Sequence, residues 1–492
     1  MRRRSRPNSD EPTQAQEDTA NGTKSPKVST NEIVLVLSLV VATRIGYSLL
    51  GVRFNTSVIG TFWQFLDQDL LHHDLIRSVW ALHSQPPLMN LLAGLFLKLP
   101  QTLGNHLFHA LFLLGSLAMS VALLVLQARL GISRAIRVMA TLLFVLSPAV
   151  VLYENFFFYT HLATVMVALA ALFLYRFVGQ EHVVDGALFF SLMAAATLTR
   201  SLYHPIILLL LALALVCIGA GFRRRVLLAA ALPLLIAGAW FLRGYVLFGV
   251  PSGSSWLGMS LAQMVGRMIP EGELHELAKD SPRAAILRIR PFSPITDYNG
   301  MIPRPKPSGY RALDDPFKEN GLPNFNYRSY IPISGRYLDA FFWLLQKNPT
   351  PYCKAVWASQ VLFFRSPSDS EWLGANLVRI EPVDRWFRLL VYGQLERFGG
   401  TLSPRSVSWS LVVLLPIVIC RSLWWALSRI RRYGWRDPSA VTVLFMLGMI
   451  AWVYAVGNLC ELGENNRFLY LVLPLAMVLT AKTVSLSLPS RT

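Results

Sequence analysis

Apolar blocks of roughly twenty residues, separated by polar links, dominate this sequence. An α-helix of that length crosses a hydrocarbon core about 30 Å thick. A membrane leaves helices and closed barrels as the only spanning structures, and blocks of this length predict helices. We therefore expect an all-α polytopic membrane protein with about ten spans. The ten blocks are residues 33–51, 107–126, 136–152, 162–178, 186–198, 205–222, 226–248, 407–427, 439–457 and 468–486.

The composition supports a membrane environment and argues against two other classes of protein. Of the 492 residues, 53% are hydrophobic and only 15% are charged, which is too apolar for an ordinary soluble domain of this size. The net charge of +18 would suggest nucleic-acid binding in a soluble chain. Here the Lys and Arg residues cluster in links between apolar blocks, so they report orientation and no nucleic-acid partner is expected. The four cysteines form no CxxC pair, so neither a zinc site nor a disulfide framework is predicted.

The basic links fix the predicted orientation. Residues 86–99 open with two prolines and are only marginally long, so we interpret them as a helix lying at the membrane interface. With that choice, the basic tail at residues 2–6 and the Arg-rich links at 129–137, 223–225 and 429–436 all fall on the cytoplasmic side. Both termini are then cytoplasmic. Counting 86–99 as a span would place two of these links outside.

This orientation divides the chain into four parts. Residues 1–30 lack apolar periodicity and are predicted to form a disordered cytoplasmic tail. Residues 31–248 form an N-terminal transmembrane module that includes a first outer loop at 52–106. Residues 249–405 form an extracytoplasmic domain, mainly helical, with one helix near 352–364. Residues 406–492 form the C-terminal transmembrane module.

The first outer loop concentrates acidic, imidazole and amide groups just above the membrane. Asp67 and Asp69 precede His83 and Gln85 in this segment. A carboxylate partly desolvated by aromatic neighbours and the bilayer edge could act as a general base toward an acceptor hydroxyl. Capping of an interfacial helix is the structural alternative for both aspartates.

Further charged residues follow the outer ends of other spans. The group comprises Glu154, Arg200, Arg243, Glu464 and Arg467, and all are predicted to face the same side as Asp67. Arginine clamps phosphate bidentately and stabilises a leaving charge, while a carboxylate positions or deprotonates an acceptor. For any single residue, snorkelling or a structural ion pair is the alternative. Their common side is what favours one outer site.

Two more features concern buried charge and metals. Arg44 lies within the first apolar block, where it needs a cavity or a partner, so a functional role is considered for it. Asp67, Asp69 and Glu154 could together hold a hard divalent cation such as Mg²⁺ or Mn²⁺ through oxygen ligands. Adjacent histidines on a helix diverge, so His72, His73 and His83 do not predict a zinc site.

Five motifs, taken in order, resemble the GT-C superfamily of lipid-dependent glycosyltransferases. The chain is most similar to the branch with protein O-mannosyltransferases and aminoarabinose transferases, glycosyltransferase family 39. The resemblance extends over most of residues 33–486. The motifs are Phe65-Leu66-Asp67-Gln68-Asp69, His83-Ser84-Gln85-Pro86-Pro87-Leu88, Leu198-Thr199-Arg200, residues 243–251 and Gly463-Glu464-Asn465-Asn466-Arg467.

The resemblance implies a GT-C-like helix bundle that performs an inverting transfer. The donor is a polyprenyl-phosphate-linked sugar, and the acceptor is a lipid, glycan or protein at the outer face of a bacterial cell membrane. Asp67 is the implied base, with Asp69 as the other possibility, and arginines face the lipid phosphate. His83 and Gln85 shape the implied acceptor site. The family has metal-dependent and metal-independent members, so Mg²⁺ or Mn²⁺ stays open. A carrier or flippase of a lipid-linked or polar solute is the alternative function, and a non-catalytic membrane protein is the third.

Overall fold

The computed structural model describes residues 28–303, 305–396 and 403–488. The predicted tail at residues 1–30 lies outside these ranges except for its last three residues. Within the described ranges every regular element is a helix, and the only β-pairing is two isolated bridges. The all-α prediction is therefore confirmed for this part of the chain.

Within the described ranges, seven helices are long and apolar enough to cross a membrane by length and composition, which supports the prediction of a membrane protein with several spans. α8 (Arg134–Val145) and α9 (Pro148–Glu154) would give an eighth if this pair, bent by 52°, is one span. The predicted blocks at 186–198 and 205–222 form α11 (Val183–Thr199) and α12 (Pro205–Cys217), which have 17 and 13 residues. The count of ten is not confirmed. The seven are α2 (Thr30–Leu49), α7 (Gln101–Arg129), α10 (Tyr159–Gln180), α13 (Ala220–Phe248), α21 (Trp409–Tyr433), α22 (Pro438–Cys460) and α23 (Asn465–Ser487).

Proline sets the start of three of these helices. Pro148, Pro205 and Pro438 each occupy the first turn, where a missing N–H costs nothing and the fixed φ suits the helix. Ser147 and Asp437 cap two of these turns, and the Asp437 carboxylate accepts from the Ala440 N–H at 2.7 Å. The α8–α9 bend lies at one of these prolines and directs Glu154 into the bundle.

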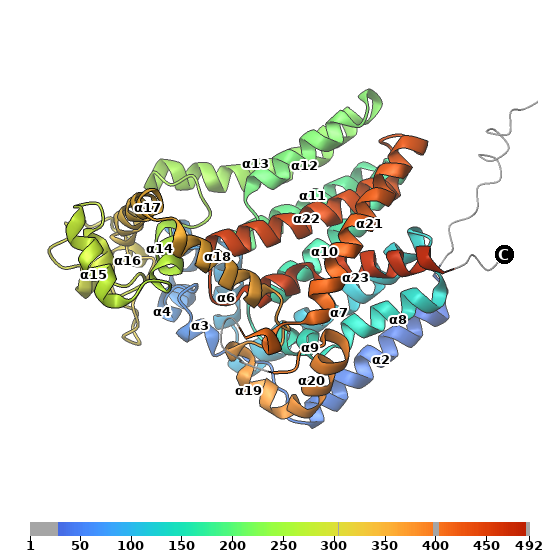
Figure 1. Cartoon of the computed structure of the whole chain (residues 1–492), viewed down its shortest axis with the longest axis horizontal. Coiled ribbons are helices and arrows are strands. Elements are labelled where there is room, and N and C mark those ends of the chain that lie inside the picture. Colours follow the sequence, from blue (N-terminus) through green and yellow to red (C-terminus); the bar gives the residue numbers. More distant parts are fainter. Residues whose placement is uncertain (1–27, 304, 397–402, 489–492) are drawn as a thin grey trace, which may run out of the picture.

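The basic links meet at one end of the bundle. Glu181, in the α10–α11 link, pairs with Arg225 of α13 and lies 3.7 Å from Arg436 of the α21–α22 link. Near the end of α23, the Lys482 ammonium donates to the Leu130 carbonyl after α7 at 2.8 Å. These links occupy the right-hand end of Figure 1. The basic links therefore lie together at one end of the bundle, as predicted.

The opposite end of the bundle carries the first outer loop and the first part of the outer domain (Figure 1, left). Trp256, Met259, Tyr330 and Tyr337 belong to a core separate from that of the bundle. The loop helices are α3 (Val58–Thr61), α4 (Gln68–His73), α5 (Leu75–Trp80) and α6 (Leu88–Leu97). The domain helices are α14 (Leu257–Gly266), α15 (Glu271–Asp280), η1 (Ala285–Arg288), η2 (Ile295–Tyr298), α16 (Arg311–Asp314) and α17 (Tyr330–Lys347).

The second part of segment 249–405 returns to the bundle. α18 (Thr350–Phe363) confirms the helix predicted near 352–364, and the Tyr352 hydroxyl donates to the Leu459 carbonyl at the end of α22. Leu373 and Ile380 belong to the main core of the bundle. This segment is therefore not a single independent unit. Its short helices are η3 (Glu371–Leu373), α19 (Gly374–Leu377), η4 (Val378–Ile380), α20 (Glu381–Phe387), η5 (Arg388–Tyr392) and η6 (Pro404–Ser406).

Candidate functional site

A cavity of about 330 Å³ lies at the outer-domain end of the bundle. The first outer loop contributes Trp63, Gln64 and Gln85 to its lining, and α14 contributes Gln263. Arg200 follows α11, and Arg467 stands in the first turn of α23. Segments far apart in the sequence thus meet at one opening. Of the predicted site residues, Gln85, Arg200 and Arg467 line it.

Two buried arginines dominate the charge of this cavity. Arg200 is 6% exposed and Arg467 is 5% exposed. The Glu461 carboxylate lies between them, 3.4 Å from Arg200 Nη2 and 3.7 Å from Arg467 Nη2. Among the residues that the structure describes, Arg200 Nη1 and Arg467 Nε are buried and have no hydrogen-bond partner. A buried donor without a partner is costly, so these two N–H groups are suited to an anion entering the cavity.

The α22–α23 link holds these charges in position. Glu464 is the residue that precedes α23, and its carboxylate pairs with Arg467 at 2.7 Å. Burial raises the pKa of the Glu464 carboxyl, and the Arg467 charge opposes that rise. The Asn465 side chain accepts from the Gly463 N–H and donates to the Glu461 carbonyl at 2.9 Å. Glu461 itself remains 41% exposed toward the cavity.

Aromatic side chains form the other walls. Trp63 is 45% exposed and stacks on Phe292 with 5.2 Å between ring centroids. The Arg200 guanidinium lies 4.4 Å from the ring centre of Tyr159. Trp452 closes one side, where its indole N–H donates to the Leu202 carbonyl at 2.8 Å. Exposed ring faces beside cations suit a ligand with both apolar and anionic parts.

An apolar groove of about 350 Å³ adjoins this cavity. Side chains of α10, α11, α12 and α22 line it, and no charged residue is among them. Trp452 lines both the groove and the cavity. The groove is built on apolar helices, of which α10 and α22 are candidate membrane spans, and its end at Trp452 adjoins the cavity that holds Arg200.

The two predicted catalytic aspartates lie outside this cavity. The Asp67 carboxylate caps α4 by accepting from the Asp69 N–H at 3.2 Å, and it also accepts from the Glu319 N–H at 2.6 Å. Asp69 pairs with Arg311 at 2.9 Å and with His73 at 2.8 Å, and these partners lower the pKa of its carboxyl. The capping alternative thus describes Asp67, although Trp63 and Gln64 of the same segment do line the cavity.

His83 and Arg243 also lie outside the cavity, where they join the first outer loop to neighbouring elements. His83 Nε2 donates to the Asn326 carbonyl at 2.9 Å, and Nδ1 lies 2.7 Å from the Ser255 hydroxyl. Burial lowers the pKa of His83 to about 3. Arg243 donates to the carbonyls of Trp80 and Leu82 at 2.7 and 2.6 Å. Neither side chain lines the cavity, although both were predicted to bind substrate.

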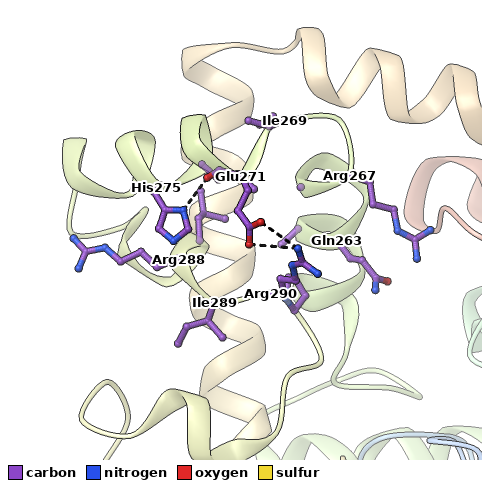
Figure 2. Close-up of a pocket in the computed structure, with 13 residues that line it drawn as sticks. Gln263, Arg267, Ile269, Glu271, His275, Arg288, Ile289 and Arg290 are labelled. Atoms are coloured by element: carbon purple, nitrogen blue, oxygen red, sulfur yellow. Dashed lines mark hydrogen bonds and ion pairs between the residues drawn. The ribbon is translucent and has the colours of Figure 1, made fainter.

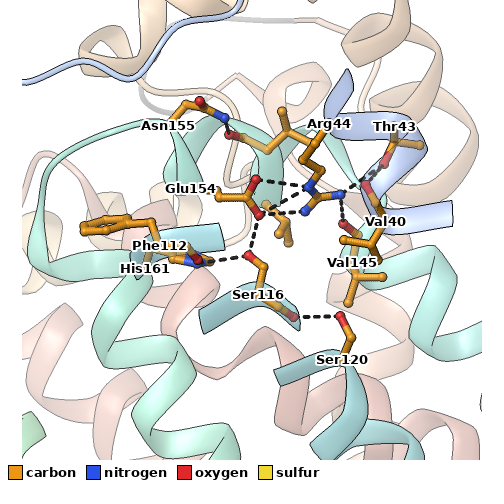
Figure 3. A network of polar contacts seen from close by, with 12 residues as sticks. Val40, Thr43, Arg44, Phe112, Ser116, Ser120, Val145, Glu154, Asn155 and His161 are labelled. Carbon is orange, nitrogen blue, oxygen red and sulfur yellow. Dashed lines mark hydrogen bonds and ion pairs between the residues drawn. The ribbon is translucent and has the colours of Figure 1, made fainter. Parts of the chain in front are cut away.

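Glu154 faces into the bundle, toward Arg44 (Figure 3). It is fully buried, and Arg44 Nε and Nη2 lie 3.0 and 2.9 Å from its two oxygens. Ser116 donates to Glu154 and also contacts His161 at 3.1 Å, while Arg44 Nη1 donates to the Val145 carbonyl. The partner that the buried Arg44 required is therefore Glu154.

The expectation that Asp67, Glu154, Arg200 and Arg467 meet in one cavity is wrong for Asp67 and Glu154. Asp67 instead accepts a hydrogen bond from the backbone N–H of Glu319, and Glu154 pairs with the buried guanidinium of Arg44. The set of Asp67, Asp69 and Glu154 suggested for Mg²⁺ or Mn²⁺ is not brought together either. No group of three His, Cys, Asp or Glu residues in the described ranges is arranged to hold a metal ion.

Sequence reasoning missed several cavity residues. Glu461 lies in the predicted outer link but carried no assigned role, and its distance of six residues from Arg467 gave no signal of contact. Tyr159 and Trp452 resemble members of an interfacial aromatic belt, which is the simplest interpretation of such residues near span ends. Gln263 is an unremarkable polar residue in sequence. Only the packing of α14 against the link reveals it.

Comparison of the sequence with models of protein families found no matching family, and comparison with curated proteins found no matching protein.

Proposed function

We propose that this protein is a membrane glycosyltransferase that moves a sugar from a polyprenyl-phosphate carrier to an acceptor hydroxyl at the extracytoplasmic face. The observation that carries the proposal is the pair of buried arginines, Arg200 and Arg467, in one cavity beside an apolar groove. A lipid-linked sugar phosphate needs an apolar channel, a cationic clamp and a pocket for the sugar. These three features adjoin one another here. The family resemblance of the motifs agrees with this assignment.

The proposed reaction places the donor across the boundary between groove and cavity. The polyprenyl chain lies between α12 and α22, and its phosphate accepts from the free N–H groups of Arg200 and Arg467. The acceptor oxygen attacks the anomeric carbon from the opposite side, and the bond from that carbon to the phosphate oxygen breaks. The polyprenyl phosphate leaves with the electron pair, and the arginines stabilise its charge. Configuration at the anomeric carbon inverts.

The acceptor proton requires a carboxylate, and two residues compete for this role. Glu461 lines the cavity and is exposed to it, although its pairs with both arginines draw it toward the phosphate position. Asp67 is the base that the resemblance implies, and its use would require release of the Glu319 N–H. Substitution of each carboxylate decides between them.

The test is transfer by the purified full-length protein in detergent with a short-chain polyprenyl-phosphate sugar. Arg200→Gln and Arg467→Gln are each expected to lower kcat/KM about a hundredfold or more, the scale found when one charge-stabilising donor is removed from a reacting site. Arg53→Gln is a suitable control because the Arg53 guanidinium lies outside the cavity lining and donates to the carbonyl and hydroxyl of Ser48 and the carbonyl of Val52. It should retain full activity.

The base is assigned in the same assay with Glu461→Gln and Asp67→Asn. Loss of kcat in only one variant identifies the proton acceptor. Retained transfer in both arginine variants would refute the proposed clamp. The alternative function, a carrier or flippase, is distinguished with proteoliposomes, since movement of intact lipid-linked sugar across the bilayer without any product would favour it.

A further inference from the structure

A second cavity, of about 450 Å³, lies in the outer domain between α14, α15 and the segment that follows them through η1. Figure 2 shows its polar residues. Arg267 and Gln263 point to one side in this view, Arg288 points to the other, and Arg290 lies between them with Glu271. In this view Arg290 lies between Arg288 and Arg267, and the three side chains are named the arginine row. Neither the proposed phosphate clamp nor the outer-domain core uses these side chains.

The residues that line this second cavity carry a net positive charge. Its lining holds three arginines and a single carboxylate, that of Glu271. Arg290 Nη2 lies 3.3 Å from both Glu271 oxygens, and both side chains are largely exposed, so water screens this pair strongly. Within the described ranges, no carboxylate lies within ion-pair distance of Arg288 or Arg267. Arg267 instead donates to the Leu462 carbonyl at 2.5 Å.

The second cavity adjoins the first at α14. Gln263 lines both, and Ala262 and Gly266 face the second while Leu257 and Ser260 face the first. Positions three and four apart share one side of a helix, so Gln263 stands where the two faces of α14 meet. Arg267 extends from the second cavity to the α22–α23 link that carries Glu461. A chain lying along the arginine row would therefore lead toward the proposed reaction centre.

We propose that the second cavity binds the acceptor, and that the acceptor is an anionic chain with repeated phosphate or carboxylate groups. Three arginines in a row suit several negative groups in succession better than a single small anion. The identification of this chain as the acceptor rests on the proposed sugar transfer. The binding itself does not require it.

Binding is therefore measured without a donor, by titration calorimetry on the detergent-solubilised full-length protein. The probes are a hexamer of glycerol phosphate, a hexamer of galacturonate and neutral maltohexaose. Tighter binding of one anionic hexamer tells phosphate from carboxylate recognition. The test variant is Arg288→Gln with Arg290→Gln, and the control is Arg283→Gln with Arg336→Gln. The control removes the same charge from exposed outer-domain positions that do not line this cavity.

The native protein is expected to bind at least one anionic hexamer about tenfold more tightly than maltohexaose, and only the test variant should lose this preference. The preference should also weaken with salt. Equal binding of the neutral hexamer, or equal losses in both double variants, would overturn the proposal. Anion binding by a protein without transfer activity would instead refute the glycosyltransferase function and leave the site in place.

Discussion

Replacing Arg44 by methionine tests the role of the buried network that joins α2 to the bundle. Arg44 is 9% exposed and Glu154 is fully buried. The substitution preserves much of the side-chain volume but removes the contacts to both Glu154 oxygens and to the Val145 carbonyl. Among the described residues, Glu154 would then keep only the Ser116 hydroxyl as a hydrogen-bond donor. Breaking a buried pair by removing one charge costs about 3–5 kcal/mol, because the other charge stays buried.

The double variant Arg44→Met with Glu154→Leu sharpens the test. It removes both charges together, so it should cost less than Arg44→Met alone, and the coupling between the two sites should be large. Arg134→Met is the matched control. Arg134 lies 3.5 Å from Glu32 but is 65% exposed, so its loss should cost about 0–1 kcal/mol.

The assay is equilibrium unfolding of the purified protein in mixed micelles, followed by tryptophan fluorescence and helical circular dichroism. Coincident transitions from the two probes are required before a free energy of unfolding is extracted. The reasoning is refuted if Arg44→Met is as mild as Arg134→Met. It is equally refuted if the double variant costs the sum of the two single substitutions, because no coupling then exists.

Two further predictions concern the outer domain. The folded-state pKa of His83 is about 3 against an ordinary value of 6.5, so the unfolded chain binds the extra proton and stability should fall as pH drops from about 6.5 toward 3. Lowering the pH from 7 to 5 should reduce the free energy of unfolding, measured by thermal unfolding, by about 2 kcal/mol. His83→Gln should remove that part of the pH dependence of stability. Gly258→Ala would place a Cβ 1.9 Å from the Ser334 carbonyl oxygen of α17, and a loss of about 3 kcal/mol is expected. Gly335→Ala, whose Cβ would meet no atom within 4 Å, should be neutral or stabilising, and equal stability of the two glycine variants would contradict the close packing of α14 on α17.

Long apolar blocks made the membrane-spanning helices predictable. The predicted blocks correspond to α2, α7 and the other spans because hydrophobic length is a property of one segment alone. The helix at α18 and the short helix at α6 were also predictable, since proline and polar residues mark their limits locally. The number of spans was less accessible, because α11 and α12 are shorter than a standard span.

The candidate site was only partly predictable. Arg200 and Arg467 were identified because both lie at the outer ends of predicted spans on the same side as Asp67, where arginine can bind a lipid phosphate. Asp67 and Glu154 were misplaced for one physical reason. Sequence tells that an acid lies near the membrane surface, but not which donor reaches it first. A backbone N–H reaches Asp67, and the guanidinium of α2 reaches Glu154.

The sequence alone therefore determined that the chain suits a membrane environment and that its fold is all-α. It also determined that the basic links lie apart from the charged links at the other end of the bundle. These features follow from the length of each apolar block and from the order of the basic links, which can be read segment by segment along the chain. The tertiary structure decided which charges meet. Glu461 joins Arg200 to Arg467, and Gln263 joins two cavities, only because helices remote in sequence pack at one place. Such contacts depend on how the ends of remote helices pack together, so they cannot be deduced from any one segment of the sequence.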